Sequence, residues 1–167
     1  MSFLVRQTSL DDAEPLVTMH LAAHREAYAR LLPEAAFAAR EARIPERVER
    51  QRGIIRDAHS HWIAVDDDGV LGFAHAGPPR DDADGGWPPP EDYELYGLYV
   101  LARGHGLGVA QELVGRAIGD RPAYLWVLDD NPKAQAFYRK SGFVRNQSKR
   151  ELPAEWYALS EVQMVRR

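Results

Sequence analysis

Three glycines in close succession form the stretch of this chain whose spacing points most directly to chemistry. Gly104, Gly106 and Gly108 lie in the segment VLARGHGLGVA, residues 100–110, between an aromatic-rich run and an apolar pattern with helical spacing. At the start of a helix the backbone N–H groups point outward and the dipole favours negative charge, while glycines let an anion approach the backbone. The segment therefore predicts an anion-binding loop, and a tight turn without a ligand is the alternative.

Two widespread phosphate-binding motifs do not fit this loop. A P-loop ends in Gly-Lys followed by Ser or Thr, whereas Gly108 is followed by Val109 and Ala110. A dinucleotide-binding fingerprint would need glycine at Val109 or at Gln111, depending on which glycine comes first. The pattern therefore argues against both a nucleotide triphosphatase and a Rossmann-type dinucleotide site.

The loop resembles the acetyl-CoA loop of the GCN5-related N-acetyltransferase (GNAT) family, where Gln/Arg-x-x-Gly-x-Gly/Ala follows a strand that ends in Val. Two alignments are available, RGHGLG starting at Arg103 and HGLGVA starting at His105. The five steps from Val100 to His105 match the family's spacing, and the other alignment would put polar Gln111 at an apolar core position. The resemblance therefore favours the alignment that begins at His105.

A second segment carries the same resemblance. YLWVLDDNPKAQAFYRKSGFV, residues 124–144, resembles the family's strand followed by Asn and then by Ala-x-x-Phe-Tyr-x-x-x-Gly-Phe. By resemblance, Tyr138 is the general acid that protonates the departing CoA thiolate, and a core tyrosine is the alternative. The other CoA-contacting positions that the motif implies are Asn131, which also suits a helix cap, Ala134 and Phe137, which is also expected in the core.

The resemblance implies acetyl-CoA as co-substrate and a set of backbone contacts to it. Loop amides would cradle the pyrophosphate, and amides at the end of the preceding strand would bind pantetheine and stabilise the oxyanion of a tetrahedral intermediate. No metal is expected, since His20 and His24 have no carboxylate partner at metal-ligand spacing. The cofactor-binding residues expected in this part of the chain are Leu98, Tyr99, Val100, His105, Gly106, Leu107, Gly108, Val109 and Ala110.

Acetyl transfer to an amine also needs a way to remove a proton. An alkyl ammonium has a pKa of about 10.4, and only the neutral amine can attack. Glu94 lies six residues before Val100, where some family members place a glutamate base. Strand alternation predicts that Glu94, Tyr96, Leu98 and Val100 share one face of the strand. A water chain as base, with Glu94 as a surface residue, is the alternative.

The function that the resemblance implies is direct transfer of acetyl to a primary amine of a small molecule, peptide or protein. A non-catalytic acyl-CoA sensor and an acyltransferase for larger acyl groups remain open, although the presence of both Tyr138 and Glu94 favours the enzyme. Helices within 13–45 and the segment 78–92 are expected to form the acceptor wall. In that segment Asp81, Asp82, Asp84, Trp87 and Glu91 are the residues of interest.

Composition agrees with one globular domain over residues 1–167. A formal charge of −4 argues against a nucleic-acid-binding protein, and the absence of cysteine excludes disulfides and a thiolate nucleophile. No signal-peptide pattern begins the chain, and no apolar run reaches the length of a membrane span. We therefore expect a cytoplasmic protein without a membrane segment, and the resemblance adds a homodimer through the late strands as an option.

The elements that must position these residues alternate along the chain as one mixed α/β domain. The resemblance implies a GNAT fold, with a mixed, mostly antiparallel sheet of six or seven strands that splays between the fourth and fifth strands and is flanked by helices. Helices are expected over 13–32, 34–42, after Pro45, and over 108–119 and 130–142. Strands are expected over 3–8, 61–67, 70–77, 93–101, 123–128, 143–150 and 157–166.

Overall fold

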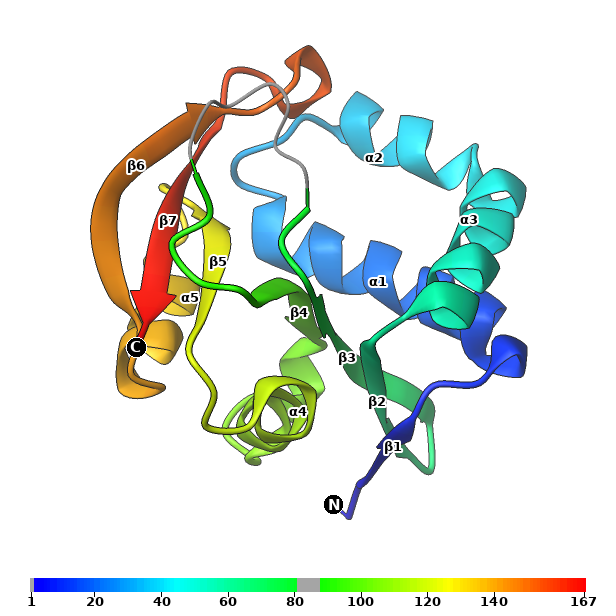
Figure 1. The fold of residues 1–167 in the computed structure, drawn as a ribbon. Coiled ribbons are helices and arrows are strands. Elements are labelled where there is room, and N and C mark those ends of the chain that lie inside the picture. Colours follow the sequence, from blue (N-terminus) through cyan, green and yellow to red (C-terminus); the bar gives the residue numbers. More distant parts are fainter. Residues whose placement is uncertain (1, 81–87) are drawn as a thin grey trace.

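The computed structural model describes residues 2–80 and 88–167. In this part of the chain a seven-stranded sheet has the order β1-β2-β3-β4-β5-β7-β6 (Figure 1). The strands are β1 (Leu4–Gln7), β2 (Ser60–Asp66), β3 (Gly69–Gly77), β4 (Glu94–Val100), β5 (Ala123–Leu128), β6 (Val144–Glu151) and β7 (Ser160–Arg166). The α-helices are α1 (Ala13–Tyr28), α2 (Glu34–Glu41), α3 (Ile44–Asp57), α4 (Val109–Ile118) and α5 (Pro132–Lys140). Short 3-10 helices are η1 (Leu10–Asp12), η2 (Ala102–Gly104) and η3 (Ala154–Trp156).

The centre of the sheet contains its one parallel contact. β4 runs parallel to β5, and every other neighbouring pair is antiparallel. The β4–β5 register consists of Glu94 opposite Tyr124, whereas β4 stays paired with β3 as far as Val100. The expected mixed, mostly antiparallel sheet with a splay between its fourth and fifth strands is therefore confirmed.

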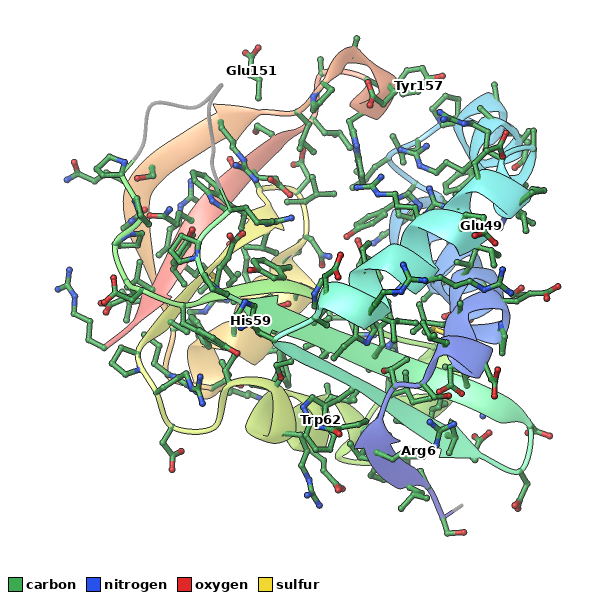
Figure 2. The ribbon with its side chains drawn as sticks, turned by 45° about the vertical axis from the view of Figure 1, so that its right-hand side comes forward. Arg6, Glu49, His59, Trp62, Glu151 and Tyr157 are labelled. Atoms are coloured by element: carbon green, nitrogen blue, oxygen red, sulfur yellow. The ribbon has the colours of Figure 1, made fainter. Side chains whose placement is uncertain are left out.

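Helices cover the two faces of the sheet and create two separate cores. On one face, Leu16 and Met19 of α1 pack against Ile63 and Phe73. On the other face, α4 and α5 pack over β3, β4 and β5 in a larger cluster that includes Leu113. Trp62, labelled in Figure 2, packs against this second cluster, with the guanidinium of Arg116 of α4 5.7 Å from its ring. The central strands are thus covered on both faces, and a ligand that reaches them must enter between strands or between helices.

Local signals place the two helices that flank the splay. Gly108 caps α4 with φ +85°, a left-handed conformation that favours glycine. At α5 the Asn131 side chain accepts a hydrogen bond from the Ala134 amide at 3.1 Å, and Pro132 occupies the first helical position. Both helices therefore begin close to where the sequence predicts, α4 after the loop that follows β4 and α5 after the loop that follows β5.

The expected alternation along β4 is wrong, because the strand contains a β-bulge. His75 pairs with Gly97 and Ala76 with Leu95, which leaves Tyr96 as an extra residue in β4. Leu98 and Val100 pack against the core that contains α4, whereas the Tyr96 ring lies 4.8 Å from the His75 ring. Since an inserted residue reverses the alternation beyond it, Glu94 and Tyr96 do not share a face with Leu98 and Val100.

The first helix also ends earlier than expected, at Tyr28 rather than at 32.

Neither a membrane helix nor a metal cluster occurs in the described ranges. No helix there combines the length and the apolar character that crossing a bilayer requires. No group of three or more His, Asp or Glu side chains there is placed to hold a metal ion.

Four histidines are largely withdrawn from solvent, two on α1 and two in strands β2 and β3 of the sheet. Burial is the main cause that lowers the pKa of His20 and His61 to about 3 and that of His24 and His75 to about 4. The His24 ring is 5% exposed and lies 4.7 Å from the Tyr28 ring and 5.1 Å from the Trp156 ring. Its two nitrogens have no hydrogen-bond partner among the described residues. These histidines therefore resist protonation in the folded state.

The pKa values of these histidines in the folded state lie below the ordinary value of 6.5. Below about pH 6.5 the unfolded chain therefore binds more protons than the folded state, and the free energy of unfolding decreases. The His24→Phe variant keeps a planar ring and loses no hydrogen bond. We expect its stability near neutral pH to match the parent, and its loss at about pH 5 to be smaller by about 1–2 kcal/mol. Urea unfolding across this pH range measures both. Exposed His59→Phe is the matched control, and identical pH slopes for parent and His24→Phe would contradict the assignment.

Candidate functional site

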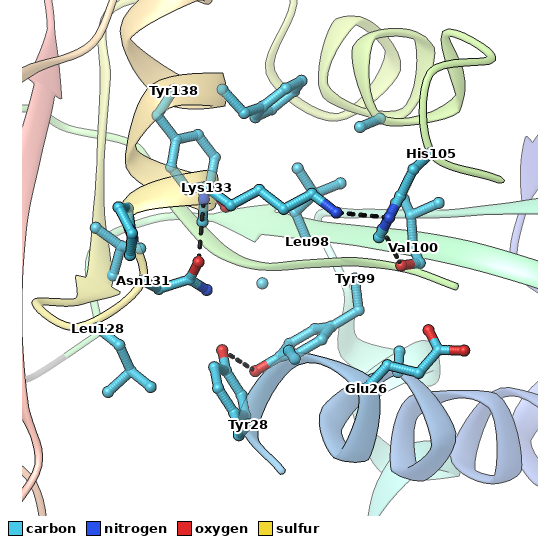
Figure 3. A pocket seen from close by; sticks show the side chains of 18 of the residues that line it. Glu26, Tyr28, Leu98, Tyr99, Val100, His105, Leu128, Asn131, Lys133 and Tyr138 are labelled. Carbon is cyan, nitrogen blue, oxygen red and sulfur yellow. Dashed lines mark hydrogen bonds between the residues drawn. The ribbon is translucent and has the colours of Figure 1, made fainter. Parts of the chain in front are cut away.

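A cavity of about 880 Å³ opens where β4 and β5 separate (Figure 3). Its walls come from α1, β4, the glycine loop, β5, the start of α5 and the segment around η3. The sequence-predicted residues that line it are Leu98, Tyr99, Val100, His105, Gly106, Ala110, Asn131, Ala134, Phe137 and Tyr138. The predicted residues that do not belong to its lining are Leu107, Gly108, Val109 and Glu94.

The glycine loop presents backbone donors at the end of this cavity. Gly106 and Gly108 have φ values of +80° and +85°, so both adopt the left-handed conformation. The first helical hydrogen bond of α4 runs from the Glu112 amide to the Gly108 carbonyl at 3.0 Å. The amides that precede Glu112 in the first turn of α4 consequently have no acceptor within the helix, and they form a positive pole for an anion.

Arg103 and His105 have different surroundings. The Arg103 guanidinium forms an ion pair with the buried carboxylate of Asp66, and Arg103 is not part of the cavity lining. His105 lines the cavity, and its Nδ1 accepts a hydrogen bond from Lys133 Nζ at 2.7 Å. Since Nδ1 accepts, Nε2 carries the hydrogen and donates to the Val100 carbonyl at 3.0 Å. The geometry thus favours the alignment that begins at His105.

Gly104 is packed closely against two apolar side chains. A Cβ atom there would lie 2.9 Å from Val100 Cγ1 and 3.0 Å from Leu71 Cδ1. This glycine lets η2 pack directly on the end of β4, whereas Gly106 and Gly108 provide the left-handed conformations.

Several residues of the cavity were not predicted from the sequence. Lys133, in the first turn of α5, reaches across to His105 and brings a cation to the glycine-loop end. Trp156 of η3 and Glu161 of β7 are two further lining residues that the sequence did not predict. Tyr28 and Trp126 also line the cavity, in the 13–45 region and the strand 123–128 that the sequence analysis expected beside the site. For Lys133 a signal existed, because it lies two residues after Asn131 in the second motif. The others come together only through the fold.

With this geometry in place, comparison with known proteins decides the family. Residues 21–143 match the model of the acetyltransferase (GNAT) family. The chain belongs to the GNAT family. GNAT enzymes use acetyl-CoA as the acetyl donor, which agrees with a cavity that ends at the amides of α4.

Solved structures show the same fold. The PaiA N-acetyltransferase of Thermoplasma acidophilum, solved in complex with coenzyme A, is 20% identical, with a TM-score of 0.73 and coverage of 100% of this chain and 99% of that one. The ribosomal-protein-alanine N-acetyltransferase of Brucella melitensis is 18% identical, with a TM-score of 0.66 and coverage of 98% of both chains. A search of curated protein sequences gives no significant match.

In this GNAT domain, Tyr138 lies on α5 and faces the cavity (Figure 3). Its side chain is 7% exposed, and its ring packs at 5.4 Å from the Phe137 ring and 5.9 Å from the Phe143 ring. Burial raises the pKa of the Tyr138 phenol well above its ordinary value. The phenol is therefore protonated at neutral pH, as a proton donor must be.

Glu94 occupies a different environment. It is 1% exposed, forms an ion pair with Arg80, and accepts hydrogen bonds from the Arg80 amide at 3.1 Å and the Tyr124 hydroxyl at 3.2 Å. These contacts hold it at the closed end of the splay, outside the lining of the cavity. This position lends no support to a role for Glu94 as the base that deprotonates the acceptor. The predicted acceptor-wall residues Asp81, Asp82, Asp84 and Trp87 lie outside the described residues.

The glycine loop can be tested by changing one of its two left-handed glycines. In Gly108→Ala the left-handed conformation is strained by about 1–2 kcal/mol, and relief of the strain turns the first amides of α4 away from the anion. We expect the Kd for CoA to rise about tenfold, measured by calorimetry. Gly115→Ala, in the middle of α4, where a Cβ would meet nothing within 4 Å, is the matched control and should leave the Kd unchanged.

Arg103→Ala separates the two alignments of the motif. Because it leaves the buried Asp66 carboxylate without its ion-pair partner, we expect a loss of about 3 kcal/mol in the free energy of unfolding. The Kd for CoA should change by less than about threefold, which is under 0.7 kcal/mol. A loss of CoA affinity as large as that of Gly108→Ala would show that the motif begins at Arg103.

Lys133 provides a further prediction. Its ammonium stands beside the anion site, so Lys133→Ala should raise the Kd for CoA about tenfold at low salt, with a smaller effect at high salt. Lys140→Ala, at the exposed far end of the same helix, is the control. Equal effects of the two variants, measured by titration at two ionic strengths, would refute a specific contact.

Proposed function

We propose that this protein transfers the acetyl group of acetyl-CoA to a primary amine by direct attack. The observation that carries the proposal is the cavity between β4 and β5, whose lining includes a protonated tyrosine, the glycine loop and the separated part of β4. When bound, acetyl-CoA supplies the reactive thioester. The chain supplies the anion site, the orientation and the proton donor.

The donor end is formed by α4 and α5. The first-turn amides of α4 bind the pyrophosphate, while Lys133 and the His105 side chain that it contacts flank this site. Beyond the Glu94–Tyr124 pair, the edge of β4 that faces β5 is not paired with it. In the proposal, amides along Leu98–Val100 bind the pantetheine arm and donate to the carbonyl oxygen as it becomes negative.

The chemical step involves one bond formed and one bond broken. The neutral amine attacks the thioester carbonyl carbon and forms the C–N bond, and the C–S bond breaks with its electron pair remaining on sulfur. Tyr138 donates its phenolic proton to that sulfur. The nitrogen releases one proton to water, and the Tyr138 oxygen takes a proton back from solvent. The proposal assigns this proton to water rather than to Glu94, which is not part of the cavity lining. The products are an N-acetylated amine and the CoA thiol.

Thiol release from acetyl-CoA, measured with a panel of amines, tests this function. We expect amine-dependent release with the parent protein. For Tyr138→Phe we expect kcat to fall about 100-fold, because general acid catalysis contributes this much, with the Kd for CoA within about twofold. Exposed Tyr157→Phe is the control. Equal losses in kcat and CoA affinity would reject the general-acid role, and CoA binding without release by any amine would favour an acyl-CoA sensor.

A further inference from the structure

The acceptor end of the cavity is lined by aromatic rings. Tyr28, Tyr99, Trp126 and Trp156 all contribute to the lining. The hydroxyls of Tyr28 and Tyr99 lie 3.5 Å apart, and the Trp156 ring meets the Tyr28 ring edge-on at 6.0 Å. In Figure 3, Tyr28 and Leu128 lie at the opposite end of the cavity from His105. Aromatic faces attract cations, so this end suits an ammonium group.

Glu161 contributes a carboxylate to this aromatic end. Glu161 of β7 pairs with Leu128 in the β5–β7 register, and it lines the cavity with 19% of its side chain exposed. The Arg150 Nε and Nη2 atoms each lie 3.1 Å from Glu161 Oε2. The same guanidinium lies 4.2 Å from the centre of the Trp126 ring. Arg150 therefore links the carboxylate to the aromatic wall and fixes its position.

The negative charge of Glu161 acts electrostatically on the phenols of Tyr28 and Tyr99. Burial raises the pKa of both Tyr28 and Tyr99, and the negative charge of Glu161 adds to the rise. The other charged residues of the described lining are Glu26, Arg30, Asp130 and Lys133. Glu26 accepts a hydrogen bond from the Ala102 amide at 2.7 Å and Lys133 contacts His105, so both lie toward the glycine loop. Both phenols are neutral, and Glu161 is the carboxylate that Arg150 ties directly to the aromatic wall at Trp126.

We propose that this end of the cavity selects a cationic amine that carries no carboxylate group, and that Glu161 is the residue that recognises its charge. The inference rests on the proposed acetyl transfer and names its acceptor class. A second amino group on the acceptor would be stabilised by the same carboxylate and rings. A carboxylate on the acceptor would face Glu161 and be repelled, because like charges in a partly buried site are unfavourable.

Three acceptors with the same carbon chain test the inference: butylamine, 1,4-diaminobutane and 4-aminobutanoate. With saturating acetyl-CoA, we expect kcat/KM for each of the first two to exceed that for 4-aminobutanoate at least about tenfold, which is 1.4 kcal/mol. Glu161→Gln should raise the KM for 1,4-diaminobutane about fivefold, with kcat and the Kd for CoA nearly unchanged. It should also reduce the ratio of kcat/KM between 1,4-diaminobutane and 4-aminobutanoate. Glu155→Gln, an exposed residue of η3, is the matched control.

A second variant separates recognition from a structural role of the ion pair. Arg150→Gln removes the same ion pair but leaves the carboxylate, so we expect the KM for 1,4-diaminobutane to fall. A merely structural pair would make the two variants change KM and thermal stability in the same direction. That result, or use of 4-aminobutanoate as efficient as that of butylamine, would overturn the inference and leave acetyl transfer intact. Absence of amine-dependent thiol release would instead reject the proposed function.

Discussion

β4 and β5 share one paired register position, Glu94 opposite Tyr124, and the site depends on this incomplete pairing. Two parallel strands that stayed in register would satisfy each other's backbone groups and leave no space between them. Here each strand is held by its other neighbour, β4 by β3 and β5 by β7, so the gap does not break up the sheet. The cavity of about 880 Å³ is the space that results, and its edges carry backbone groups that a substrate can pair with.

The closed end of the splay is held by a polar cluster around the buried carboxylate of Glu94. Glu94 accepts from Tyr124 on the neighbouring strand and pairs with Arg80, which follows β3. Removing either partner of a buried ion pair is costly, because the remaining charge stays away from water. The cluster therefore ties together three segments at the point where the two strands diverge. These contacts give the buried glutamate of β4 a structural role at the point where the strands diverge.

The open end is organised by two helix starts. α4 begins directly after Gly108 and α5 directly after Asn131, so both positive poles lie near the cavity. The contact between Lys133 and His105 joins the two helix starts, and the His105 hydrogen bond to Val100 joins them to β4. An anion bound there would thus be held by groups from three elements whose mutual positions are fixed by short contacts.

Sequence by itself determined the parts of this protein that depend on neighbouring residues. The glycine spacing, the Asn131 cap and the strand and helix order are local patterns. The motifs that contain Gly106 and Tyr138 are also local, and they indicate the GNAT family. The family match then agreed with that assignment. The bulge at Tyr96 could not be predicted, since it exists only in the register between β3 and β4. The ion pair between Arg103 and Asp66 likewise forms only after folding. The same holds for the cavity wall that Glu161 shares with Trp126 and Tyr28. Local backbone preferences act over a few residues, whereas packing of the sheet decides which distant side chains share a cavity.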